Sequence, residues 1–167
     1  MKIALCGTTC AGKTTLAEAF SDKHDIHMIR ETAEQVIEKR MTFAGQLAIA
    51  SLLAYEMEKH DDYISDRSLF DCYIYNKIYE LDDQLSDFIF YMATESYENI
   101  DLFVFVDEYF PLEDNGIREM DVDTQKLVFS KLRFMMEKMK FYNNDKILFV
   151  TGTTEERIGQ IEEKINE

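Results

Sequence analysis

Short apolar runs alternate along this chain with longer segments whose apolar residues recur at helical spacing. An apolar run of about four to eight residues that ends at a polar residue or a glycine is typical of a buried parallel strand. The run Leu102–Val106 gives the clearest signal, since it consists of leucine, valine and phenylalanine alone. The pattern predicts strands at residues 2–6, 26–30, 63–66, 102–106 and 146–150.

Helical spacing fills most of the chain between these strands. Thr42 is a suitable N-cap for one long helix, and a polar stretch at 108–121 containing Pro111 predicts a loop. Strands that alternate with helices indicate an α/β fold with a parallel sheet, in one domain over residues 1–167. Helices are predicted at residues 13–23, 31–40, 42–60, 67–79, 84–97 and 122–140, and after residue 154.

The composition favours an ordered globular protein in a reducing compartment. Of 167 residues, 46% are hydrophobic and one is proline. No apolar run approaches the roughly 20 residues that span a bilayer. The first apolar run leads directly into a glycine-rich loop, so we interpret it as a strand and not as a signal peptide. The odd number of cysteines, 3, also favours a cytoplasmic location.

The formal net charge of −15 bears on possible partners. An acidic surface repels phosphate backbones, so binding to nucleic acid without sequence preference is disfavoured. The sequence contains no basic run that would reverse this. The three histidines, His24, His27 and His60, show no ligand spacing in the sequence.

The most specific motif follows the first predicted strand. Two glycines, Gly7 and Gly12, permit a backbone whose amides face inward around an anion. Lys13 is expected to reach the β- and γ-phosphates of a nucleotide, and the Thr14 hydroxyl to bind Mg²⁺. A glycine turn formed by chance between a strand and a helix is the alternative. The predicted nucleotide-binding residues here are Gly7, Thr8, Thr9, Cys10, Ala11, Gly12, Lys13, Thr14 and Thr15.

Charged residues follow the second and third predicted strands, where the carboxyl ends of a parallel sheet form a ligand site. Asp66 is the candidate partner of Thr14 at Mg²⁺, and Arg67 can present its planar fork to a phosphate or an acceptor. Glu31 is a candidate general base. Structural roles compete, since Asp66 and Arg67 could cap a helix and Glu31 could stabilise a helix dipole. The sequence leaves open whether Glu31 or Asp66 is the base.

Two further candidates lie nearer the carboxyl terminus. Arg118 lies in the predicted loop at 108–121, and a loop that carries one arginine could cover a bound triphosphate. A solvated loop without a role is the alternative. Thr153 is expected either to flank the adenine of ATP or to cap the last helix.

Taken together, these motifs resemble those of small P-loop kinases. They comprise the loop at 7–14, Glu31-Thr32-Ala33, Asp66-Arg67-Ser68, Asp114 to Arg118, and the segment 151–157. The sequence looks most like ribosylnicotinamide-kinase-like and AAA-labelled P-loop domains, with nucleoside and nucleoside-monophosphate kinases as wider relatives. This resemblance implies a P-loop NTPase fold, three layers α/β/α with a five-stranded parallel sheet in the order 2-3-1-4-5. It also implies ATP with Mg²⁺ as phosphoryl donor.

The predicted function is ATP-dependent transfer of a phosphoryl group to the hydroxyl of a nucleoside or a (deoxy)nucleoside monophosphate. By the same resemblance Arg67 and Arg118 would bind phosphates, with Lys13, Glu31 and Asp66 completing the catalytic set. Two alternatives remain, a P-loop ATPase without a small-molecule acceptor and a kinase acting on modified bases in DNA. No membrane partner is expected, and the sequence leaves open whether the chain forms a homodimer.

Overall fold

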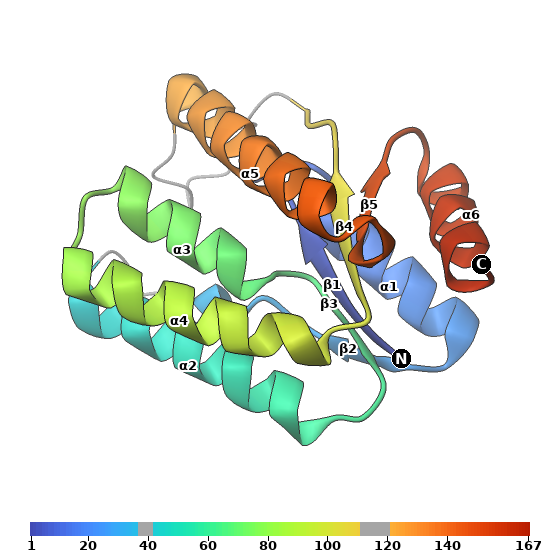
Figure 1. Cartoon of the computed structure of the whole chain (residues 1–167), viewed down its shortest axis with the longest axis horizontal. Helices are drawn as coiled ribbons and strands as arrows, with labels where there is room; N and C mark the ends of the chain where they lie inside the picture. The colour runs from blue at the N-terminus through green and yellow to red at the C-terminus, as the bar shows by residue number, and fades with distance from the viewer. Residues whose placement is uncertain (37–41, 111–120) are drawn as a thin grey trace.

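The computed structural model describes residues 1–36, 42–110 and 121–167 (Figure 1). Strands and helices alternate along the chain, as the apolar pattern predicts. In order they are β1 (Lys2–Cys6), α1 (Lys13–His24), β2 (His27–Ile29), η1 (Thr32–Gln35), α2 (Phe43–Lys59), β3 (Tyr63–Ser65), α3 (Leu69–Ile78), α4 (Asp83–Asn99), β4 (Leu102–Val106), α5 (Val122–Tyr142), η2 (Asn144–Lys146), β5 (Ile147–Val150) and α6 (Thr154–Ile165).

The strands form one five-stranded sheet in the order β2-β3-β1-β4-β5, with every neighbouring pair parallel. β1 lies at the centre and pairs with β3 on one side and β4 on the other. The α/β fold and the strand order 2-3-1-4-5 are therefore confirmed. This order brings the segments that follow β1, β2 and β3 to the same edge of the sheet.

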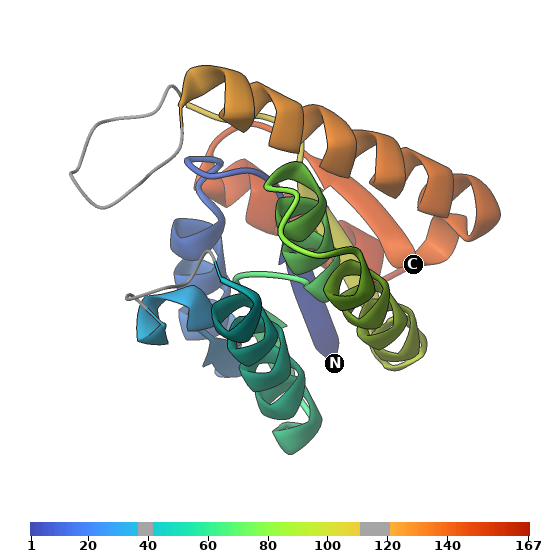
Figure 2. The same cartoon turned by 90° about the vertical axis from the view of Figure 1, so that its left-hand side faces the viewer.

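Helices cover both faces of the sheet. Successive side chains of β1 and β4 point to opposite faces, and because they are apolar on both faces, each face needs a layer of helices to bury it. Ile3 and Leu5 pack with α1 and α6 in one apolar cluster, whereas Ala4 and Cys6 join the cluster beneath α2, α3, α4 and α5. Figure 1 shows α1 and α6 on one side of the sheet, and Figure 2 shows the other four helices in front of it. All five residues of β4 are buried, which fits a central strand covered on both faces.

Side-chain caps fix the starts of α2 and α3. Thr42 accepts a hydrogen bond from the Gly45 amide at the start of α2, as expected for an N-cap. Ser68 forms a capping box with Asp71 at the start of α3. Among the described residues, none of the helices combines the length and apolar character needed to cross a bilayer.

The helix predicted over residues 31–40 is wrong in its described part. A short 3-10 helix, η1, replaces it, and Val36 leaves helical geometry at φ −119° and ψ 53°. Residues 37–41 lie outside the described residues. The Thr32 hydroxyl donates to the Ile49 carbonyl at 3.0 Å, so a contact with α2 holds this segment in place of a regular helical ladder.

Candidate functional site

The loop between β1 and α1 has the backbone geometry of an anion cradle. Gly7 and Gly12 both have positive φ, at 152° and 82°. A Cβ added at Gly12 would lie 3.0 Å from a guanidinium nitrogen of Arg157, so both conformation and space favour glycine there. Cys10 also has positive φ, at 60°, which is uncommon for a residue with a side chain. The sequence does not indicate this third left-handed position in the loop.

Lys13 is the first residue of α1 and turns back over the loop. Its side chain is 8% exposed, and its Nζ donates to the Thr8 carbonyl oxygen at 2.9 Å. An ammonium group held in this way lies beside the loop amides and the positive end of the α1 dipole. The three features together place positive potential where a polyphosphate would bind.

Thr14 and Asp66, which the sequence pairs as magnesium ligands, lie in contact. The Thr14 hydroxyl donates to an Asp66 carboxylate oxygen at 2.7 Å. Burial raises the pKa of Asp66, although Lys13 and the Thr14 hydroxyl partly oppose that shift. A hydroxyl and a carboxylate are hard oxygen donors of the kind that Mg²⁺ prefers, and an ion between them would relieve the buried charge.

Glu31 and Arg67, at the ends of the neighbouring strands β2 and β3, form an ion pair. The Arg67 guanidinium also lies over the Tyr75 ring, 5.1 Å from its centroid. Burial alone would lower the pKa of Arg67, but Glu31 and other nearby groups outweigh burial, so its pKa is raised and the side chain stays charged. Arg67 Nε is buried without a hydrogen-bond partner among the described residues.

Asp71 supports the phosphate loop from α3, a role that the sequence did not predict. It is fully buried, and one carboxylate oxygen accepts a hydrogen bond from the Gly7 amide at 3.1 Å. Its other oxygen accepts from the Ser68 amide and hydroxyl. The same side chain therefore caps α3 and fixes the first residue of the loop.

Gln125, a fully buried residue of α5, supports the phosphate loop. Its amide nitrogen donates to the carbonyls of Thr9, at 2.9 Å, and Phe110, at 3.0 Å. The Thr8 hydroxyl donates in turn to the Gln125 backbone carbonyl at 3.2 Å. Nothing local marks this glutamine as special, because its partners precede it by 15 and 116 residues.

Replacing Gln125 with alanine should destabilise the protein by roughly 1–3 kcal/mol, since it removes a buried side chain and leaves the part-buried carbonyls of Thr9 and Phe110 without their donor. Urea unfolding followed by circular dichroism measures the change. Lys126→Ala is the matched control, because it removes an exposed side chain one position further along α5 and should cost well under 1 kcal/mol. Equal urea midpoints for the two variants would contradict the role of Gln125 in supporting the loop.

Arg157 contacts the loop from α6. It is 3% exposed, and it donates to the Ala11 carbonyl at 2.9 Å and to a Glu108 carboxylate oxygen at 2.8 Å. Thr153 is the N-cap of α6, where its hydroxyl accepts from the Glu156 amide at 3.3 Å. The capping alternative for Thr153 thus has a direct structural basis, and its proposed contact with adenine stays a prediction. Arg118 lies outside the described residues.

The described candidates therefore gather at one edge of the sheet. Lys13, Thr14 and Asp66 lie at the carboxyl ends of β1 and β3, and the Glu31–Arg67 pair joins them across β2 and β3. Thr15 is exposed on α1 beside Thr14.

Comparison with known proteins agrees with this geometry. The model of the AAA domain family matches residues 2–157. Deoxyadenosine kinase from M. mycoides with bound dCTP superposes with a TM-score of 0.71 and 19% identity, covering 99% of each chain. Thymidylate kinase from Candida albicans gives 0.59 and 17%, over 98% of this chain and 90% of that one. Shikimate kinase from Aquifex aeolicus gives 0.58 and 17%, over 99% and 96%. Comparison with curated proteins returned no match.

Proposed function

We propose, from the premise that this chain belongs to the AAA domain family, that it transfers the γ-phosphoryl group of ATP to a hydroxyl of a nucleoside or a (deoxy)nucleoside monophosphate. The observation that carries the proposal is the meeting of Lys13, the Thr14–Asp66 pair and the Glu31–Arg67 pair at one sheet edge. A cradle alone would serve any nucleotide-binding protein. The Glu31–Arg67 pair beside it supplies a base and a positive charge for an acceptor.

The donor half of the site consists of the loop, Lys13, Thr14 and Asp66. The loop amides and the Lys13 ammonium would hold the β- and γ-phosphates of ATP. Thr14 and Asp66 would hold Mg²⁺, which when bound offsets charge on the phosphate oxygens. The buried position of Asp66 supports this assignment, because an unpaired carboxylate there is costly without a cation.

The acceptor half consists of Glu31 and Arg67. Glu31 is 29% exposed, so an incoming hydroxyl can reach its carboxylate, whereas Asp66 is committed to Thr14. We therefore assign Glu31 as the group that takes the acceptor proton and Asp66 as the metal ligand. Arg67 orients Glu31 through their ion pair.

Charge at this half favours a nucleoside over a monophosphate. A monophosphate brings about two negative charges at neutral pH and needs a free cation to receive them. The positive charge of Arg67 is already opposed by Glu31. An uncharged sugar hydroxyl adds no charge to this pair, so we expect nucleosides to be the better acceptors.

A coupled assay of ADP release tests the proposal, with Mg²⁺·ATP fixed and a panel of nucleosides and their monophosphates as acceptors. We expect release that depends on the acceptor and is faster with at least one nucleoside than with its monophosphate. Faster release with the monophosphate would overturn the expected preference for nucleosides but would leave the kinase assignment standing. Steady hydrolysis that no acceptor changes would overturn the kinase assignment and indicate an ATPase.

Arg67→Lys should raise KM for the acceptor by about 10- to 100-fold with a smaller effect on KM for ATP, since lysine keeps the charge but lacks the planar fork. Initial rates at varied acceptor and ATP concentrations measure both constants. Arg133→Lys is the control, because Arg133 forms a comparable pair with Asp107 at the end of β4 but is 42% exposed. Equal changes in the two variants would argue against a role for Arg67 at the acceptor.

A further inference from the structure

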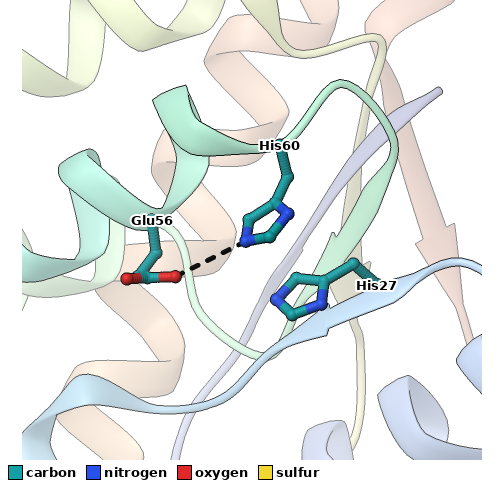
Figure 3. Close-up of side chains that lie close together, drawn as sticks. All are labelled: His27, Glu56 and His60. Carbon is teal, nitrogen blue, oxygen red and sulfur yellow. Dashed lines mark ion pairs between the residues drawn. The ribbon is translucent and has the colours of Figure 1, made fainter.

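Two histidines and a glutamate meet at the opposite edge of the sheet from the phosphate loop (Figure 3). His27 is the first residue of β2, Glu56 lies in the last turn of α2, and His60 follows that helix as its C-cap. Because β2 and β3 pair with His27 opposite Tyr63, the start of β2 lies beside the chain that has just left α2. The sequence spacing of the histidines does not indicate this proximity, which the fold creates between His27 and His60.

The ligand atoms of these residues are close enough to share one ion. One atom from each of the three lies within 4.8 Å of the other two. His60 Nε2 lies 3.6 Å from Glu56 Oε2, and the two imidazole rings stack with centroids 3.7 Å apart. Donor atoms around a tetrahedral zinc ion are about 3.4 Å apart. The 3.6 Å pair is therefore close to this spacing, and the third atom must approach by at most about 1.4 Å. His27 is exposed and can rotate to do so.

One donor atom in this cluster lacks the partner that a buried polar atom normally has. His60 Nε2 is buried and accepts or donates no hydrogen bond among the described residues. It points toward the Glu56 carboxylate and His27 (Figure 3). The other oxygen of Glu56 contacts the Lys59 ammonium at 3.4 Å, so Lys59 leaves Oε2 facing the histidines.

We propose that His27, Glu56 and His60 bind one zinc ion, or a divalent cation of similar preference, with water as the fourth ligand. Two imidazoles and one carboxylate form a donor set that zinc accepts, and an ion would satisfy the buried His60 nitrogen.

The bound ion would join the two ends of the segment 27–60. This segment begins with the edge strand β2, carries Glu31, and returns through α2. β2 has only three residues and pairs on one side alone, so its own backbone bonds hold it weakly. A cross-link from β2 to the end of α2 would fix this edge of the sheet without touching the phosphate loop.

Zinc titration of the full chain tests the site, by calorimetry and by thermal unfolding, in excess Mg²⁺ and without nucleotide. We expect one equivalent to bind, and Tm to rise by about 5–10 °C at 100 times Kd. His27→Ala and His60→Ala should each lower the affinity at least tenfold. Glu56→Gln, which keeps the side-chain shape, should do the same without changing the metal-free Tm appreciably.

His24→Ala is the matched control, because His24 is a partly exposed histidine that pairs with Glu162 on α6 instead. It should bind zinc like the unchanged chain. Cobalt absorption gives an independent readout, since nitrogen and oxygen ligands lack the strong thiolate band that Cys10 would produce. Zinc binding that persists equally in His27→Ala and His60→Ala, a thiolate band, or no uptake at all would overturn the proposal. None of these outcomes bears on phosphoryl transfer.

Discussion

Replacement of Lys13 by alanine should leave a folded protein whose phosphoryl transfer is slower by about 10³-fold. Lys13 is buried against the loop, with its Nζ held by the Thr8 carbonyl at 2.9 Å. The ammonium is therefore already placed before any phosphate arrives, and preorganised charge of this kind contributes on the order of 10²–10³ in rate. The loop amides remain in the variant, so nucleotide affinity should fall less than kcat.

Steady-state kinetics with the best acceptor and calorimetry with Mg²⁺·ATP measure the two effects separately. Lys23→Ala is the control, since it removes an exposed lysine from the same helix, paired with Glu162 at 2.6 Å on the surface. That variant should retain nearly full activity. If Lys13→Ala transferred phosphate at the unaltered rate, the loop would not be the donor site and the proposed function would fail with it.

The sheet and the phosphate loop could be predicted from the sequence because their signals are local. Strands β1 and β4 coincide with the predicted runs, since each is a short apolar segment that ends at the ligand edge. The pairing of Thr14 with Asp66 could also be foreseen, because both follow strands that lie next to each other in the predicted order.

The segment after β2 was mispredicted because tertiary contacts outweigh its local preference. Thr32 donates to α2, and Glu31 pairs with Arg67 beyond β3. Both side chains at the start of the expected helix are thus held by partners elsewhere in the fold. Helical propensity is a weak preference that such contacts routinely override.

The supporting residues could not be found from the sequence because their partners are remote. Gln125 reaches Thr9 across 116 residues, and Arg157 reaches Ala11 across 146. The histidine cluster depends on the register of β2 against β3, and a shift of one residue would turn His27 to the other face. The order of residues along the chain does not specify which residue of β2 pairs with which residue of β3.

Replacement of Asp66 by asparagine should make the protein more stable and nearly inactive. Burial raises the pKa of Asp66 in the folded chain, so the folded protein binds this proton more tightly than the unfolded chain does. The stability that this group contributes is complete below its unfolded pKa and is lost as pH rises through its folded pKa. At neutral pH the ionised carboxylate therefore destabilises the fold, and an uncharged amide of the same shape removes that cost.

The activity should change in the opposite direction. Asparagine can still accept the Thr14 hydrogen bond through its amide oxygen, but it provides no negative charge for Mg²⁺. We expect kcat to fall by about 10²–10³-fold. The activity of the unaltered protein should decline as pH falls through the raised pKa of Asp66, whereas any residual activity of Asp66→Asn should lack that decline.

Thermal unfolding without nucleotide, over a range of pH, measures the stability change, and the same scans with Mg²⁺·ATP measure binding. The Tm of Asp66→Asn should exceed that of the unaltered protein at neutral pH, and the two should converge in acid. Added Mg²⁺·ATP should raise the Tm of the unaltered protein by more than it raises the Tm of Asp66→Asn. Asp61→Asn makes the same charge change at an exposed position before β3 and should alter neither quantity appreciably. A lower Tm for Asp66→Asn at neutral pH would show that the carboxylate stabilises the fold, and metal binding would then not be the reason for its buried charge.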